Sequence, residues 1–313
     1  MLKQLNNGIE FAKILKAIKN RELLLLALFT TERCNSRCQH CHIWEKKNPA
    51  DMPVSMIENI MDDFPNAQIG IGGGEAILHP DIEGILKLFN QKKRSYTMIS
   101  NGIKVDYLEF IVNKYKVPNL GLSCDGTWET YKQARGIDNY DNIVSLLRRL
   151  KGKTNLHLSY LISEWNNREE LLKIAELSKE FNVGLHIDCY DEIPYYDTTA
   201  PRIKKIYKAD DVQGYPTSKC LRLYNKWIEG NYKVPCHMAK YTCSVTASGD
   251  VFCCERQPVI LGNLNTQSLF EIWYSSKNIE VQDELASCNK CLATCHRAVD
   301  VAISDLIPKF VRL

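Results

Sequence analysis

Short apolar runs alternate with helical patterns along the first two thirds of the chain, and this alternation limits the possible fold more than any other feature. The apolar runs have the length of buried strands, and the segments between them carry apolar residues three and four positions apart. Repeats of this kind predict a parallel sheet with right-handed crossovers. The expected strands are 23–30, 67–73, 95–100, 119–125, 155–162 and 183–189, and the expected helices are 55–63, 82–90, 106–114, 140–150 and 168–181.

Unusual residues follow four successive expected strands. Three cysteines within 34–41 follow the first strand, GGGE (72–75) ends the second, SNG (100–102) ends the third and SCDG (123–126) ends the fourth. Each motif alone is an ordinary turn sequence. Active sites of parallel β/α folds form at the carboxyl ends of the strands. Four such motifs in succession therefore predict one site at this rim.

The cysteine spacing after the first strand is C-x3-C-x2-C, at Cys34, Cys38 and Cys41. Such thiols suit zinc, with His40 or His42 as a fourth ligand, or a 4Fe-4S cluster that keeps one iron open. The chain has 13 cysteines, and its first residues lack the order of a secretory signal peptide. Metal ligation is therefore favoured over disulfides.

Taken together, these motifs resemble the radical S-adenosylmethionine (SAM) superfamily over about residues 20–190. The resemblance implies that Cys34, Cys38 and Cys41 hold a 4Fe-4S cluster whose open iron binds SAM. Reductive cleavage of SAM would then give a 5′-deoxyadenosyl radical that removes a hydrogen atom from the substrate. Ala76 stands where the family usually has proline. The SAM contacts implied by the resemblance are His40, Gly73, Gly74, Glu75, Ser123, Asp125 and Arg135.

A second set of cysteines has the order C-x12-G-x4-C, a gap, and C-x2-C. This order resembles the auxiliary-cluster region called SPASM or, in a shortened form, twitch. The resemblance implies one auxiliary 4Fe-4S cluster on Cys236, Cys254, Cys288 and Cys291. A zinc knuckle on the same residues is the alternative. The possible substitute ligands are Cys243, Cys253 and Cys295.

The expected fold class is α/β: a partial (β/α)6 TIM-type barrel with a C-terminal cysteine-rich extension. We expect an N-terminal helix at 1–22, the radical SAM core at 23–190, a connector at 191–230 and the auxiliary-cluster domain with a closing helix at 231–313. The connector is expected from its Tyr, Pro, Asp and Thr content, which lacks the preceding periodicity.

The function predicted from the resemblance is a radical SAM oxidoreductase whose auxiliary cluster accepts an electron or holds the substrate. Peptide maturation and oxidation of a small molecule, such as a natural product, sugar or lipid, both remain open. The partner would be a reductant such as flavodoxin or ferredoxin, and the location would be the cytoplasm. The alternatives are a non-catalytic iron-sulfur electron carrier and a zinc-stabilised binding module.

Several further expectations concern partners and residues near the site. The 40 basic and 37 acidic residues nearly balance, so nucleic acid is not expected as a partner. Three lysines of the first helix, Lys13, Lys16 and Lys19, form either a membrane-binding face or a solvated one. No catalytic acid or base is assigned. The candidate hydrogen-atom donors are Cys189 and Cys220, the candidate substrate contacts are Asp188, Tyr190 and Asp191, and Cys124 is expected to pack against the helices.

Overall fold

The computed structural model describes residues 20, 22–190, 219–254, 259–292, 297, 300, 301 and 304. The parts of the chain outside the described residues are the expected N-terminal helix apart from Asn20 and Glu22, residues 191–218 of the connector, Cys295 and most of the closing helix.

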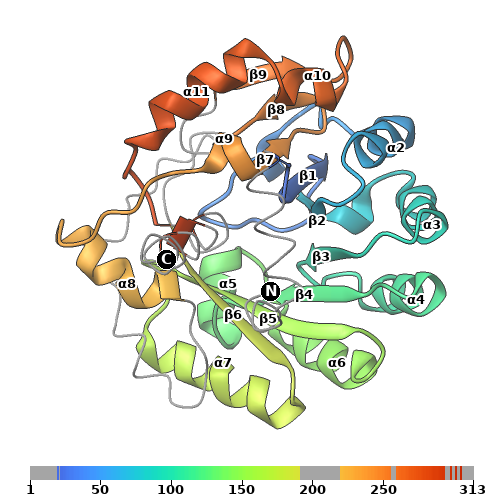
Figure 1. Ribbon diagram of the computed structural model, residues 1–313. Helices are drawn as coiled ribbons and strands as arrows, with labels where there is room; N and C mark the ends of the chain where they lie inside the picture. Colours follow the sequence, from blue (N-terminus) through green and yellow to red (C-terminus); the bar gives the residue numbers. More distant parts are fainter. Residues whose placement is uncertain are drawn as a thin grey trace.

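The nine strands of the described residues form one sheet, in the order β6-β5-β4-β3-β2-β1-β7-β8-β9. Neighbouring strands from β1 to β6 are parallel, as the repeats predicted. Figure 1 shows the strands as an open arc with helices on its outer side, which confirms the partial barrel. The six barrel strands are β1 (Leu25–Thr31), β2 (Gln68–Gly73), β3 (Tyr96–Ser100), β4 (Asn119–Ser123), β5 (Asn155–Ile162) and β6 (Gly184–Cys189).

The helices between these strands pack on the outer face of the sheet through their apolar stripes. Helix α3, for example, buries Ile85, Leu86 and Phe89, and begins at Asp81, whose side chain accepts a hydrogen bond from Gly84 N. The sequence did not predict α5, which is short and polar. The helices of the barrel are α2 (Val54–Asp63), α3 (Ile82–Gln91), α4 (Val105–Tyr115), α5 (Trp128–Arg135), α6 (Tyr140–Leu150) and α7 (Arg168–Phe181).

The inner face of the sheet is more open than the outer face. Along β5, Leu156, Leu158 and Tyr160 are buried under helices, whereas the alternating residues His157 and Ser159 are only partly buried. Small residues on neighbouring strands leave space on the inner side; a Cβ added at Gly72, for instance, would meet no atom within 4 Å. The fold therefore provides an accessible inner surface next to the strand ends.

The cysteine-rich region adds three short strands to the barrel sheet. The strands are β7 (Thr242–Val245), β8 (Asp250–Phe252) and β9 (Ile260–Asn263). Strand β7 is parallel to β1, and β8 and β9 continue the sheet with antiparallel pairing. Sequence periodicity did not predict these strands because three or four residues are too few to show an alternation. The remaining helices are α8 (Lys219–Ile228), α9 (Met238–Tyr241), α10 (Leu269–Trp273) and α11 (Ser276–Ala286).

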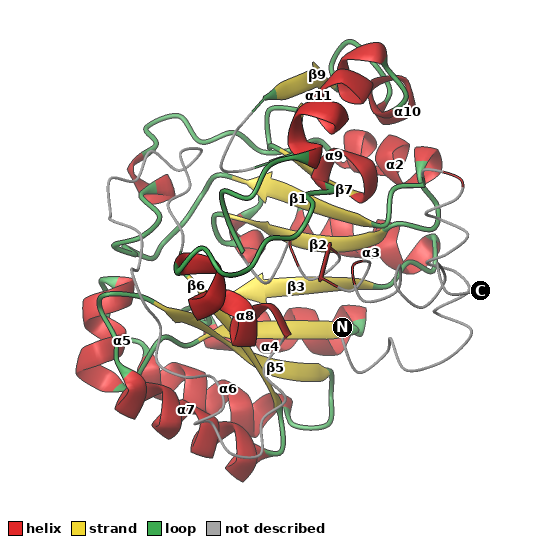
Figure 2. Ribbon diagram, turned by 60° about the vertical axis from the view of Figure 1, so that its left-hand side comes forward, coloured by secondary structure: helices red, strands yellow, loops and turns green. Residues whose placement is uncertain are grey.

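This sheet order places the two groups of cysteines at opposite ends of one strand pair. The 34–41 loop follows the carboxyl end of β1. Cys236 precedes β7 and Cys254 follows the antiparallel β8, so both lie near the start of β1, where Leu25 pairs with Thr242. The seven residues of β1 separate the two ends by about 20 Å at about 3.3 Å per residue. Figure 2 shows the β1–β7 pair from the side.

Within the described segments, we find no helix of the length and apolarity needed to cross a bilayer.

Candidate active site at the strand ends

The loop that carries the first three cysteines is anchored to the end of α5. The Ser36 hydroxyl donates a hydrogen bond to Arg135 O (3.1 Å), and Arg37 N donates to the same carbonyl (3.1 Å). Gln39 N donates to Ala134 O (3.1 Å). These carbonyls lie in the last turn of α5 and lack partners within the helix. The loop and the helix end therefore satisfy each other's backbone groups.

The three thiols lie in one partly buried loop, and burial opposes ionisation of Cys34 and Cys41. Burial is the main cause that raises the pKa of Cys34 to about 11 and that of Cys41 to about 12, and negative charge on Cys38 contributes to both values. Because these pKa values are high, the thiolate forms are favoured only when positive charge lies beside them. Binding of an iron-sulfur cluster would therefore release protons from the thiols. The set fits the three-cysteine cluster implied by the sequence. Among the described residues, no three Cys, His, Asp or Glu side chains form a compact group around a single metal ion.

An arginine–aspartate pair lies beside these thiols. Arg135 Nε lies 2.6 Å from Asp125 Oδ2, and Arg135 Nη1 lies 3.7 Å from Cys38 Sγ. The other Asp125 oxygen accepts a hydrogen bond from Leu161 N (2.8 Å). Burial lowers the pKa of Arg135, but the charges of Asp125 and Cys38 outweigh burial and raise it well above its usual value. The site thus holds a permanent cation, suited to a carboxylate ligand.

The glycines after β2 let the chain pass directly against the cysteine loop. Gly74 N donates to Thr31 O and Glu75 N donates to Arg33 O, both at 2.7 Å. Gly73 has φ +117°, and a Cβ on Gly74 would lie 2.2 Å from Arg33 O. A side chain at either position would push the two loops apart. The glycines therefore serve the packing of the site as well as any contact with a ligand.

Glu75 is a buried carboxylate held by the end of β3. Its oxygens accept hydrogen bonds from the Ser100 hydroxyl (2.8 Å) and from Asn101 N (2.7 Å). Burial raises its pKa to about 7, although both hydrogen bonds oppose the rise. The Asn101 side chain in turn donates to Asn35 Oδ1 in the cysteine loop (2.9 Å). Three strand ends are thereby linked, and an ammonium group beside Glu75 would hold the carboxylate in its charged form.

His40 lies half-buried next to two other aromatic rings. Its ring centre is 6.2 Å from those of Trp165 and Tyr190, which are 6.0 Å apart. Burial and the charge of Arg135 lower the pKa of His40 to about 4, so the ring is neutral at physiological pH. A neutral cluster of rings can pack against a flat purine. Ser123, the remaining residue implied in SAM binding, is buried at the end of β4, two residues before Asp125.

Sequence reasoning missed several residues that shape this site. Gly136 ends α5 with φ +68°, and a Cβ there would lie 2.2 Å from Arg37 O. Asn35 and Ser36 supply polar links, the first to Asn101 of the predicted SNG motif and the second to the end of α5. The glycine directly after Arg135 was a visible signal, since helices commonly end in a left-handed glycine. The polar links had no sequence signal because they depend on which loops meet.

Two cysteines of the second group, Cys236 and Cys288, lie near each other at the other end of β7. Cys236 and Cys254 are buried, and Cys288 and Cys291 are partly buried. Burial raises the pKa of Cys236 to about 11, and charge on Cys288 adds to the rise. The first and third cysteines of the motif are therefore neighbours despite their separation in sequence. This donor set fits a buried cluster with all positions occupied by protein thiolates.

The other described cysteines are buried. Cys243 and Cys253, the possible substitute ligands, are 2% and 1% exposed. Cys124 is fully buried in the hydrophobic core, and its thiol donates to Gly126 O at 3.6 Å. Cys189 and Cys220, the candidate hydrogen-atom donors, also contribute to the core. Cys253 also lies close enough to Cys236 and Cys254 for their charges to add to burial in raising its pKa, so it remains a possible substitute ligand.

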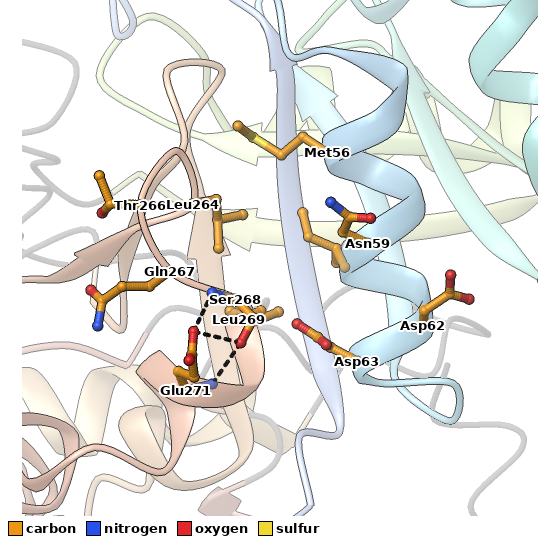
Figure 3. A pocket seen from close by; sticks show the side chains of 11 residues that line it. Met56, Asn59, Asp62, Asp63, Leu264, Thr266, Gln267, Ser268, Leu269 and Glu271 are labelled. Atoms are coloured by element: carbon orange, nitrogen blue, oxygen red, sulfur yellow. Dashed lines mark hydrogen bonds between the residues drawn. The ribbon is translucent and has the colours of Figure 1, made fainter.

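A cavity of about 380 Å³ lies away from both groups of cysteines. Figure 3 shows that its walls come from α2 and from the segment 264–271. The Ser268 and Glu271 side chains close the start of α10 with reciprocal hydrogen bonds in this wall. None of the site residues predicted from the sequence lines the cavity.

Comparison with protein families agrees with this geometry. Residues 28–178 match the Radical SAM superfamily model, and residues 236–296 match the SPASM iron-sulfur cluster-binding domain. The chain belongs to the radical SAM superfamily. More narrowly, it is a SPASM-containing member of that superfamily, and the two domains imply SAM and 4Fe-4S clusters as its cofactors.

The sequence relatives differ in their reactions. The chain is 25% identical over 316 residues to the AdoMet-dependent heme synthase of Methanosarcina barkeri, a match that covers 87% of each protein. It is 24% identical over 178 residues to the probable GTP 3′,8-cyclase of Archaeoglobus fulgidus, which covers 55% of this chain and 60% of that protein.

Solved structures with the same fold are more distant in sequence. Streptococcus suis SuiB bound to precursor peptide SuiA superposes with a TM-score of 0.69 at 17% identity, covering 87% of this chain and 71% of SuiB. The enzyme anSMEcpe with bound AdoMet gives a TM-score of 0.59 at 17% identity, covering 84% of this chain and 83% of that chain. These structures support the fold of the barrel and its extension.

Proposed function

We propose that the protein is a radical SAM oxidoreductase that removes a hydrogen atom from its substrate and passes one electron to the auxiliary cluster. When bound, the cluster of the 34–41 loop would supply the electron that cleaves SAM to a 5′-deoxyadenosyl radical. Loss of a hydrogen atom, then of an electron and a proton, completes a two-electron oxidation of the substrate.

The observation that carries this proposal is the placement of the two groups of cysteines at opposite ends of the β1–β7 pair. The accessible inner face of the barrel, described above on β5, belongs to the same sheet as these strands. A substrate on this face would have the radical-forming end on one side and an electron acceptor on the other. Electron transfer away from the substrate then needs no movement of the substrate between two sites.

The residues of the first site would each hold one part of SAM. Arg135, kept in place by Asp125, offers a cation for the methionine carboxylate. Glu75 offers a carboxylate for the amino group, and Gly73 and Gly74 bring the backbone close to it. His40 offers a neutral ring for the adenine. Ser123, which ends β4, would contact the ribose or the methionine moiety.

The substrate would contact the inner face of β5 and β6, where the exposed groups are polar. His157 and Ser159 lie on this face of β5, and the paired strand contributes His186 and Asp188. Such a surface suits a polar substrate, either a peptide or a small molecule. A peptide substrate is supported by the likeness to SuiB, solved with its precursor peptide, and small-molecule oxidation by the likeness to the heme synthase.

We propose that two parts of the chain have separate roles in this reaction. Residues 23–190 would form the catalytic core, and residues 231–313 would hold the auxiliary cluster on Cys236, Cys254, Cys288 and Cys291. A flavodoxin or ferredoxin in the cytoplasm would supply the starting electron.

The test is anaerobic incubation of reconstituted protein with dithionite and SAM. We expect 5′-deoxyadenosine, detected by liquid chromatography and mass spectrometry, and none from a variant in which Cys34, Cys38 and Cys41 are all alanine. A protein that contains both clusters, binds no SAM in calorimetry and forms no 5′-deoxyadenosine would instead be an electron carrier. Zinc in place of iron and sulfide would support the binding-module alternative.

A further inference from the structure

A buried arginine from the C-terminal segment lies beside the auxiliary thiols. Arg297 is 0% exposed and is the largest fully buried side chain in the described part of the chain. Its Nη2 donates a hydrogen bond to Val234 O at 2.6 Å. Val234 lies two residues before Cys236. The guanidinium is therefore fixed against the segment that supplies the first auxiliary ligand.

An aspartate holds this arginine and the other side of the same segment. Asp300 Oδ2 lies 3.0 Å from Arg297 Nε. Asp300 Oδ1 accepts a hydrogen bond from His237 N at 2.9 Å and lies 2.9 Å from His237 Nδ1. His237 directly follows Cys236. The Arg297–Asp300 pair thus fixes the backbone on both sides of this cysteine.

The charge of Arg297 is directed at the thiols as well as at Asp300. Burial lowers its pKa, but Asp300, Cys236 and Cys291 outweigh burial and raise it above the usual value. Among the described residues, its Nη1 has no hydrogen-bond partner. Leaving a buried donor of a charged group unsatisfied is costly. Sulfur atoms of an anionic cluster are acceptors that would satisfy it.

We propose that Arg297 positions the auxiliary cluster and raises its reduction potential, and that Asp300 limits this effect. The inference rests on the proposed function, in which the oxidised cluster takes one electron from the substrate radical while the substrate loses a proton. The reduced cluster carries one more negative charge than the oxidised one. A fixed cation in a region of low dielectric constant stabilises the more negative form, and a fixed anion opposes this.

The test measures the auxiliary cluster without turnover. The full-length chain with Cys34, Cys38 and Cys41 replaced by alanine would be reconstituted, and its remaining cluster followed by electron paramagnetic resonance during an anaerobic redox titration. The variants to compare are Arg297→Gln, Arg297→Lys and Asp300→Asn. The matched control is Arg94→Gln, because Arg94 likewise donates hydrogen bonds to backbone carbonyls, those of Met61, Phe64 and Ala67, and these bonds lie away from both groups of cysteines.

We expect opposite shifts from the two members of the pair. At the potential where the parent is half reduced, Arg297→Gln should lower the ratio of reduced to oxidised cluster about tenfold, equivalent to about 59 mV for one electron. Asp300→Asn should raise this ratio, and Arg297→Lys and Arg94→Gln should change it less than either.

An unchanged potential in Arg297→Gln at full cluster content would overturn the proposal, as would shifts of the same sign in Arg297→Gln and Asp300→Asn. If Arg297→Gln does not fold, the sign of the Asp300→Asn shift decides. Because no step uses SAM, this result is independent of whether the protein forms 5′-deoxyadenosine.

Discussion

The two groups of cysteines in this protein share one structural feature, which differs between them in its exposure to solvent. Each places a buried arginine–aspartate pair beside its thiols: Arg135 with Asp125 in the first and Arg297 with Asp300 in the second. The Arg135 side chain is 12% exposed, whereas that of Arg297 is 0% exposed. A cation that a ligand can still reach suits a cluster that binds SAM. A sealed cation suits a cluster that only exchanges electrons.

The two sites also differ in how they are assembled. The first three thiols lie in a single loop, and the groups around them come from successive strand ends. The second site joins the open end of the β7–β8 hairpin to the segment after α11 and to the C-terminal segment. The first site is therefore complete once the parallel strands of the barrel have paired, whereas the second depends on contacts between segments far apart in sequence.

The largest expected effect comes from removing one site and leaving the other. Replacing Cys34, Cys38 and Cys41 by alanine should abolish 5′-deoxyadenosine formation and remove about half of the bound iron. Replacing Cys236 and Cys288 by alanine should remove a similar share of iron but leave 5′-deoxyadenosine formation measurable. Iron analysis and product detection check both variants. Loss of all iron from either one would show that the sites are not independent.

The next effect concerns the ion pair of the first site. Asp125→Ala leaves the Arg135 guanidinium buried without its partner, so it should lower the free energy of unfolding of the apoprotein by about 3–5 kcal/mol. The double variant Asp125→Leu, Arg135→Met removes both charges and should recover most of this loss. Denaturant unfolding under anaerobic conditions measures both. A double variant no more stable than the single one would contradict the role assigned to the pair.

A smaller effect is expected from Gly136, the glycine that ends α5 and packs against the cysteine loop. Gly136→Ala should lower the free energy of unfolding by about 2 kcal/mol, because the residue has φ +68° and an added Cβ would meet Arg37 O. Gly152→Ala is the matched control: φ is +75°, but nothing lies within 4 Å of the added Cβ. The control substitution should lower the free energy of unfolding by about 1 kcal/mol. Thermal unfolding compares the two, and equal losses would mean that the contact with the loop adds nothing to backbone strain.

The smallest effect on stability concerns the pH dependence contributed by Glu75. Its pKa rises from 4.5 to about 7 on folding, so the unfolded chain loses this proton first and the apoprotein should lose stability as pH increases from about 4.5 to about 7. Glu75→Gln should remove this slope and change stability at pH 8 by about 1 kcal/mol or less, because lost hydrogen bonds offset the removed charge. The measurement is a series of denaturant midpoints against pH.

The same variant separates stability from binding. Removing the Glu75 carboxylate should weaken SAM affinity in calorimetry on the reconstituted protein, since an ammonium group would lose its anionic partner. Glu83→Gln on α3 is the control, because Glu83 is partly exposed and pairs with Lys114. This variant should keep both the pH dependence of stability that Glu75 contributes and the affinity for SAM. Weakened affinity in the control would assign the loss to a general change in charge.

Much of the barrel was predictable because its physical signals are local. The strand at 155–162 and the helix at 168–181 have the bounds expected from their apolar periodicity. The C-x3-C-x2-C loop and the GGGE motif were also recognisable, because a cluster loop needs its thiols close together and a tight approach of backbones needs glycine. Strands β7 to β9 and helix α5 are short or polar, and were not predicted.

The sequence by itself determined the class of fold and the residues that carry the two motifs, since both follow from the spacing of neighbouring residues, and the resemblance of these motifs to a known family implied the cofactors. Only the tertiary structure decided that β7 joins β1 and so puts the two groups of cysteines at opposite ends of one strand pair. It alone brought Arg135 to Cys38 and Arg297 to Cys236. Contacts of this kind depend on how the whole chain closes around its core, and no local pattern encodes them.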